Sequence, residues 1–219
     1  MFPPKCLMWY QEAYEEHDCW NEEHLIDYDY VLYPKRFYQT IDKFDDDKII
    51  DYCFIGGFKT DKKNKTLKAR IWILDFIRNY MTDKSYLQFT DKKTKQNYEP
   101  MGSFDYTLKV SGFVPKEHPV KDRNKFDENY FKTMKKSKFT LCPAGDRNYS
   151  MRFYEALMCK SIPIVNSINE TFRSKAESKL DYKYFLTTDV LEYREDWVEH
   201  NYSIFLKYHT LEYFQCSGK

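Results

Sequence analysis

From about residue 49 onward, short apolar runs alternate with stretches in which apolar residues recur every three or four positions. Short runs bounded by Gly, Pro or charged residues are typical of buried strands. They predict strands over residues 49–55, 85–89, 139–142, 162–165 and 182–186. The helical spacing predicts helices between them, over residues 66–81 and 126–134, directly before 162–165, and over 191–214.

The helix predicted over 66–81 is amphipathic. Leu67, Ile71, Leu74, Ile77 and Met81 recur at helical spacing, so we expect this face to pack on a sheet. The segment from 90 to 125 is punctuated by Lys, Pro and Gly. It is predicted to be a long irregular connection with room for one short strand, and such connections often carry function.

Strands that alternate with helices predict βαβ units. We therefore expect an α/β fold, with a Rossmann-like, mainly parallel sheet flanked by helices. The predicted organisation has three parts: an N-terminal segment over 1–47, a Rossmann-like domain over 48–190, and a C-terminal helix over 191–219 that packs back on the domain. Within the N-terminal segment, 12–23 is predicted to be a short acidic helix and 29–33 a strand.

The composition supports a folded chain without nucleic-acid character. Apolar residues make up 42% of the 219 positions, and 20 tyrosines and 17 phenylalanines supply area for a core. The formal net charge is +1, which gives no electrostatic reason to expect nucleic acid as a partner.

The cysteines and the apolar runs indicate the compartment. Six cysteines are scattered without a CxxC pair, so we expect reduced thiols, with Cys53 and Cys142 acting as small hydrophobic residues in strands. The first residues do not follow the pattern of a signal peptide. No apolar run approaches the roughly 20 residues of a membrane span. A cytoplasmic location is therefore predicted, without a membrane span.

The candidate chemistry lies in the segment from 137 to 167, which reads as strand, turn, helix and strand. The first N–H groups of a helix have no partner within it, and the helix dipole favours an anion there. Arg152 and Glu155 lie one turn apart on this helix. A guanidinium suits a diphosphate and a carboxylate suits ribose hydroxyls. The pattern predicts a nucleotide-sugar site.

Two turns follow predicted strands and are expected to meet. Gly56 and Gly57 end the strand over 49–55, and the Pro-Ala-Gly-Asp turn over 143–146 follows the strand over 139–142. Ligands of parallel α/β sheets bind beyond the carboxyl ends of the strands. Both turns are therefore predicted to border one cleft.

The same stretch resembles the donor-binding half of exostosin-type glycosyltransferases, which have the GT-B architecture and use nucleotide sugars. The resemblance covers about 30 residues. The residues that carry it are Cys142-Pro143, Gly145-Asp146, Ser150, Arg152, Glu155-Ala156 and Ser161 to Val165.

This resemblance implies that Arg152 approaches the diphosphate, that Glu155 binds the ribose, and that Gly56, Gly57 and Arg70 border the donor. It also implies an inverting, metal-independent transfer. The chain has room for one Rossmann-like domain and an abbreviated acceptor side, so the catalytic base is not identified. The Lys-, Asn- and Tyr-rich composition is similar to that of exostosin-like chains of large DNA viruses.

Each site residue also has a simpler interpretation. Arg152 and Glu155 could form a surface ion pair between positions i and i+3, and Arg70 could be solvated. Ser150 is predicted to cap the helix with its hydroxyl. Asp146 is favoured as an Asx-turn residue, with the alternative that its carboxylate orients the acceptor or takes its proton.

No metal site or cofactor is predicted. The pair Asp27 and Asp29 and the run over 45–47 resemble the Asp-x-Asp metal motif of other glycosyltransferases, but that motif should follow a strand, whereas Asp27 and Asp29 lead into one. The five histidines show no zinc-binding spacing.

The predicted function is transfer of a sugar from a nucleotide sugar to a hydroxyl of a sugar, glycan or glycoprotein. One alternative is a nucleotide-sugar or glycan-binding module without turnover. Another is a subunit that completes its cleft with a partner chain or a second copy of itself.

Overall fold

The computed structural model describes residues 30–33, 35–56, 70–89, 106–108, 128–144, 149–167 and 171–210. Its strands are β1 (Ile50–Gly56), β2 (Tyr86–Phe89), β3 (Tyr106–Leu108), β4 (Ser137–Leu141), β5 (Ile162–Val165) and β6 (Phe185–Leu186). Its helices are α3 (Lys35–Asp42), α5 (Trp72–Tyr80), α7 (Glu128–Lys135), α8 (Met151–Met158) and α9 (Glu195–Tyr208), with a 3₁₀ turn η3 (Glu177–Lys179).

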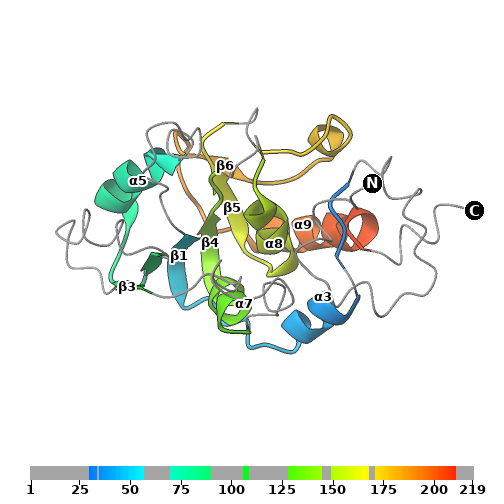
Figure 1. Ribbon diagram of the computed structural model, residues 1–219, viewed down its shortest axis with the longest axis horizontal. Helices are drawn as coiled ribbons and strands as arrows, with labels where there is room; N and C mark the ends of the chain where they lie inside the picture. Colours follow the sequence, from blue (N-terminus) through cyan, green and yellow to red (C-terminus); the bar gives the residue numbers. More distant parts are fainter. Residues whose placement is uncertain are drawn as a thin grey trace, which may run out of the picture.

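The strands form one sheet in the order β3-β2-β1-β4-β5-β6, and every pairing between them is parallel. This is the strand order of the Rossmann fold. The predicted α/β class is therefore confirmed, and β3 is the short strand for which the connection over 90–125 had room. In Figure 1 the sheet runs through the middle of the molecule, with α7 and α8 in front of it.

Alternating residues of the strands feed two hydrophobic clusters, one on each face of the sheet. In β1, Cys53 and Ile55 belong to the cluster beneath α7 and α8, whereas Phe54 belongs to the cluster beneath α5. A strand buried on both faces is expected to be apolar throughout, and all four residues of β5 are buried. The sequence signal was strong here, and the predicted bounds of β5 are confirmed.

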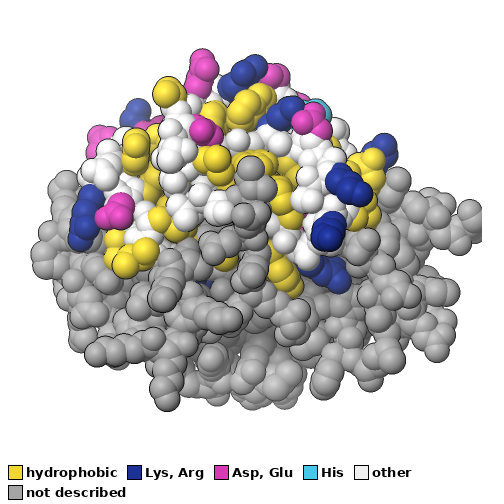
Figure 2. All heavy atoms as spheres, turned by 90° about the horizontal axis from the view of Figure 1, so that it is seen from above, with side chains coloured by type: hydrophobic (Ala, Val, Ile, Leu, Met, Phe, Trp, Pro, Cys, Tyr) yellow, Lys and Arg dark blue, Asp and Glu magenta, His cyan; other side chains and the backbone are white. Residues whose placement is uncertain are grey.

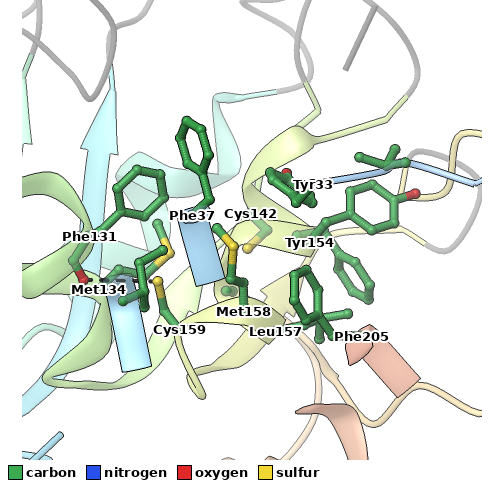
Figure 3. Close-up of a cluster of buried hydrophobic side chains, with 14 of the residues drawn as sticks. Tyr33, Phe37, Phe131, Met134, Cys142, Tyr154, Leu157, Met158, Cys159 and Phe205 are labelled. Atoms are coloured by element: carbon green, nitrogen blue, oxygen red, sulfur yellow. Dashed lines mark hydrogen bonds between the residues drawn. The ribbon is translucent and has the colours of Figure 1, made fainter. Parts of the chain in front are cut away.

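The cluster under α7 and α8 also includes residues from both ends of the described chain. Phe37 of α3 and Phe205 of α9 are almost completely buried with Tyr154 of α8, as Figure 3 shows. The thiols of Cys142 and Cys159 lie in the same cluster. Burial raises the pKa of Cys53 to about 12 and also raises the pKa values of Cys142 and Cys159. These cysteines are free thiols that serve as core residues, as predicted for Cys53 and Cys142.

The apolar face predicted for the first helix is partly wrong. Ile71 was expected to be buried but is 56% exposed, because α5 begins at Trp72. The buried face comprises Trp72, Ile73, Leu74, Phe76 and Ile77. Leu67, the first residue of the predicted face, lies outside the described residues.

The strand predicted over 182–186 is shorter than expected, since β6 contains only Phe185 and Leu186. At Lys183, the side chain of Asn201 makes the backbone hydrogen bonds that a neighbouring strand would otherwise make. Its Oδ1 accepts from the Lys183 N–H at 2.8 Å, and its Nδ2 donates to the Lys183 carbonyl at 2.7 Å. With both backbone groups satisfied by a side chain, this segment has no need of a strand partner.

The predicted N-terminal strand is replaced by a single bridge, and the helix after it was not predicted. Tyr33 pairs with Thr210 in an isolated parallel bridge, and α3 follows. Among the residues of α3 whose burial is described, Phe37 and Ile41, four residues apart, are buried. That i, i+4 pair was the available sequence signal. The predicted helix over 12–23 lies outside the described residues.

Candidate donor-binding site

The candidate site lies where the chain direction across the sheet reverses. From β1 the chain continues outward to β2, whereas from β4 it continues to β5 on the opposite side. Neighbouring β1 and β4 therefore separate at their carboxyl ends, at Gly56 and Leu141. In open α/β sheets this topological switch point is the usual place for a ligand.

Arg152, the second residue of α8, reaches across this switch point. Its Nη2 donates to the carbonyl of Ile55 at 2.5 Å, and its guanidinium carbon lies 5.5 Å from the centre of the Phe54 ring. Its Nε is buried and finds no hydrogen-bond partner within the described part of the chain. The guanidinium is thus fixed at the end of β1, and one of its buried donors is left unsatisfied by the described residues.

Gly56 makes this position of Arg152 possible. A Cβ atom at residue 56 would lie 3.0 Å from Cζ of Phe54 and 3.3 Å from Nη2 of Arg152. Both distances are shorter than ordinary van der Waals contacts, so a side chain at residue 56 would displace the arginine or the ring. The glycine is explained by this close approach.

Glu155 lies one turn along α8 and is only 1% exposed. Its Oε2 accepts a hydrogen bond of 2.5 Å from the hydroxyl of Tyr130 on α7. The predicted alternative of a surface ion pair is therefore wrong for Glu155, because its carboxylate is inside the protein. A buried carboxylate requires such donors.

The charges of this group influence one another. Burial raises the pKa of Tyr130, and the charge of Glu155 raises it further. Burial alone would lower the pKa of Arg152, but Tyr130, Cys142 and Glu155 outweigh it and the pKa is raised. Arg152 therefore remains a cation at the end of the sheet.

Arg70 also joins the two sides of the switch point. Its Nε donates to the carbonyl of Ala144 at 3.2 Å, so it contacts the turn after β4 and is more than a solvated side chain. Pro143, in the same turn, is buried. Arg152 thus contacts the end of β1, and Arg70 contacts the turn after the neighbouring strand β4.

Ser150 occupies the N-cap position of α8 but does not cap it in the predicted way. Its hydroxyl makes no hydrogen bond to the helix; instead its carbonyl accepts from the N–H of Phe153 at 3.1 Å. The residue is buried, with 4% exposed. The tight backbone contact takes the place of a side-chain cap.

The structure therefore places Arg152 against Gly56 at the end of β1, and Arg70 against the turn that contains Pro143. Gly57, Gly145 and Asp146 lie outside the described residues. That these residues bind a donor stays a prediction. The sequence did not single out Tyr130, because an aromatic residue in a short helix carries no sign of the partner it will face.

Figure 2 shows side chains of both charge signs across the described part of one face. Among the described residues, no group of three or more His, Cys, Asp or Glu could hold a metal ion. In the run over 45–47, Asp45 pairs with Lys136 at 2.7 Å and Asp46 lies 3.8 Å from Lys135. Asp27 and Asp29 lie outside the described residues. In the described part of the chain, no helix combines the length and apolarity that crossing a membrane requires.

The chain was compared with known proteins. No curated protein matches it. Among solved structures, a chain of the structure titled "Crystal structure of GtfA/B complex" is similar over 87% of this chain and 37% of its own length, with 10% sequence identity and a TM-score of 0.47. This chain thus spans little more than a third of that one.

The family model of the exostosin GT47 domain matches residues 7–197 of this chain. That range includes the whole sheet and the switch point, and it extends well beyond the stretch that carried the resemblance in the sequence. The chain belongs to the exostosin GT47 family.

Proposed function

We propose that this protein transfers a sugar from a nucleotide-sugar donor to a hydroxyl of a sugar, glycan or glycoprotein. The observation that carries the proposal is the position of Arg152. Its guanidinium lies at the carboxyl end of β1, at the switch point, with a buried Nε donor that no group among the described residues uses. In a chain of the exostosin GT47 family, a cation at this point fits a diphosphate.

In the proposed reaction, the acceptor hydroxyl attacks the anomeric carbon as the bond to the nucleotide diphosphate breaks. Negative charge then develops on the departing diphosphate, where Arg152 and the N-terminus of α8 stabilise it. A direct displacement of this kind inverts the configuration. It needs no metal ion, because the arginine and the helix supply the positive charge. The acceptor proton passes to a base, for which Asp146 is the weak candidate.

The proposed role of Glu155 requires one adjustment. Its carboxylate is 1% exposed and accepts from Tyr130, so contact with a ribose hydroxyl requires an exchange of partners. A short side-chain rotation that trades one hydroxyl donor for another has a small net cost, since each state satisfies the carboxylate. The ribose hydroxyls are chemically suited to this exchange.

The first experiment is a thermal-shift screen of the wild-type chain with UDP, GDP and their common sugar conjugates. A ligand at a hundred times its dissociation constant stabilises a protein by about 2.7 kcal/mol. The Arg152→Ala and Glu155→Ala variants should lose this shift. Arg78→Ala is the matched control, because Arg78 is exposed on α5 and pairs only with nearby Asp75 among the described residues.

Turnover is then measured with the nucleotide sugar that binds, with and without a chelator. Product formation that survives the chelator supports the metal-independent transfer. Binding without product with any common sugar conjugate would favour the binding module. If no nucleotide shifts the folded wild type, the donor-site assignment is wrong.

A further inference from the structure

Tyr130 is placed where it can organise the donor site without belonging to either strand end. It lies on α7, the helix that precedes β4, and is 4% exposed. Its hydroxyl reaches α8 and donates to Oε2 of Glu155 at 2.5 Å. A side chain from outside the strand–turn–helix unit therefore contacts the unit's own carboxylate.

The same hydroxyl also interacts with Arg152. The charge of Arg152 lowers the pKa of Tyr130, so the two groups lie close enough to influence each other. A guanidinium can only donate and an ionised carboxylate can only accept. The tyrosine hydroxyl does both, so it can accept from Arg152 while donating to Glu155.

A hydroxyl at this position constrains both side chains. Arg152 is held at its other end by the Ile55 carbonyl and the Phe54 ring. Glu155 is buried, and a buried charge adopts the orientation that its partners dictate. Removing the hydroxyl would leave Glu155 without this donor and would give both side chains more than one orientation to adopt.

We propose that Tyr130 is a positioning residue of the donor site, and that its hydroxyl holds Arg152 and Glu155 in the arrangement that receives a nucleotide diphosphate. The proposal rests on the proposed function. Tyr130 does not touch the donor in this arrangement; it acts through the two residues on α8.

The chain contains a matched control. Tyr154 is also a buried tyrosine whose hydroxyl donates to a buried carboxylate, that of Glu177. In this pair, Glu177 also accepts from the backbone N–H of Val31 and so holds the segment at residue 31. Tyr154→Phe removes the same atom in the same kind of environment, without altering the candidate site.

The experiment is a double-mutant cycle on nucleotide affinity. The dissociation constants of UDP and GDP are measured by calorimetry for the wild type, Tyr130→Phe, Glu155→Gln and the double variant. Tyr130→Phe should weaken binding about tenfold, and Tyr154→Phe should leave it unchanged. If Tyr130 acts through Glu155, the double variant binds about as well as the weaker single variant.

Three outcomes separate this inference from the proposed function. If UDP and GDP do not bind the wild type, the proposed function fails first. If Arg152→Ala abolishes binding but Tyr130→Phe does not change it, only the positioning role is overturned. Single losses that multiply in the double variant, or an equal loss in Tyr154→Phe, would indicate general packing and would also overturn the role.

A second measurement does not depend on any variant folding. Hydrogen exchange of the wild type is compared with and without saturating UDP or GDP, whichever binds. The proposal expects slower exchange in α7, because a nucleotide that fixes Arg152 and Glu155 also fixes the helix that carries Tyr130. Unchanged exchange in α7 with slowed exchange at the start of α8 would contradict it.

Discussion

Two buried tyrosine–glutamate pairs in this chain have similar chemistry and different surroundings. We call Tyr130, Arg152 and Glu155 the switch-point cluster, and Tyr154, Glu177 and the residues that bind them the anchor cluster. In the anchor cluster the carboxylate of Glu177 accepts from the backbone N–H groups of Val31 and Arg173, at 2.8 and 2.9 Å, as well as from Tyr154.

The difference between the clusters lies in their donors. Backbone N–H groups of a folded segment cannot turn elsewhere, so the anchor carboxylate is committed to holding the chain in place. In the switch-point cluster the short contact to Glu155 comes from a side-chain hydroxyl, beside a cation at the end of the sheet. Such partners can be exchanged for a ligand. A buried carboxylate alone therefore says little about function; the nature of its donors says more.

The anchor cluster also fixes the N-terminal segment. Arg173 donates to the carbonyl of Tyr30 at 3.0 Å, and Nδ1 of His209 lies 2.6 Å from the carbonyl of Val31. Since a carbonyl only accepts, Nδ1 carries the proton. Nε2 is then the acceptor for the hydroxyl of Tyr182, at 2.6 Å. Segments far apart in the sequence thus share one polar network.

The largest effect is expected for Glu177→Ala. The change leaves three donors without their acceptor inside the protein, and we expect the free energy of unfolding to fall by about 4 kcal/mol. Urea denaturation measures it, and nucleotide affinity of the folded fraction should not change. Glu199→Ala is the control, because Glu199 forms an exposed pair with Lys160, and its loss should stay within about 0.5 kcal/mol. Equal losses of unfolding free energy in Glu177→Ala and Glu199→Ala would show that the anchor cluster stabilises the fold no more than an exposed ion pair.

The second prediction concerns pH. Burial lowers the pKa of His209 to about 4, whereas it is about 6.5 in the unfolded chain. Between these pH values the unfolded chain protonates His209 whereas the folded chain does not. The contribution of His209 to the free energy of unfolding is therefore fully present above about pH 6.5 and is lost as the pH falls toward 4. At pH 4.5 the expected loss is about 2.7 kcal/mol, since each pH unit contributes up to about 1.4 kcal/mol.

Glu177 contributes with the opposite sign in part of this range, because burial raises its pKa and the folded state then takes up a proton before the unfolded one does. The difference between the wild type and His209→Gln isolates the histidine. Denaturation at several pH values should show a shallower decline for the variant. His200→Gln, at an exposed position of α9, should follow the wild type. Parallel curves for the wild type and His209→Gln would contradict the assignment.

The third prediction tests the close packing in the switch-point cluster. Gly56→Ala places a Cβ atom 3.0 Å from the Phe54 ring and 3.3 Å from Arg152. Overpacking of this kind costs about 2 kcal/mol, and the displaced arginine should weaken nucleotide binding. Adding Phe54→Leu gives the new methyl group room and should restore part of the stability. A Gly56→Ala variant that binds nucleotide and unfolds like the wild type would show that the approach of Arg152 is loose.

The sequence predicted the parts of this fold that depend on local pattern. The strands at β1, β4 and β5, and the helix between β4 and β5, follow from apolar runs and spacing, and their alternation predicts the parallel sheet. That topology also predicts that Gly56 and the turn at Pro143 border one cleft. These features required no knowledge of which side chains meet.

The features that the sequence did not predict depend on contacts between distant residues. Asn201 ends the strand pairing at Lys183 from 18 positions away, and Tyr130 faces Glu155 from 25 positions away. The chemistry of Glu155 predicts a role in binding ribose, but its burial depends on how α7 packs over α8. Periodicity identifies the buried face of a helix and does not identify the partner.

The smallest expected effect compares the two tyrosines directly. Tyr130→Phe and Tyr154→Phe each remove one hydroxyl that donates to a buried carboxylate, and each should lower the free energy of unfolding by about 1 kcal/mol. The N–H of Arg173 lies 3.1 Å from the Tyr154 hydroxyl and also donates to Glu177. In Tyr154→Phe this N–H therefore keeps an acceptor. Urea denaturation of both variants decides whether the losses match. Matched stability losses with different nucleotide affinities would show that the hydroxyl of Tyr130 serves the ligand, since the same atom in the anchor cluster serves only the fold. If Tyr130→Phe is several kcal/mol less stable than Tyr154→Phe, the switch-point cluster is itself a structural anchor and the distinction between the two clusters fails.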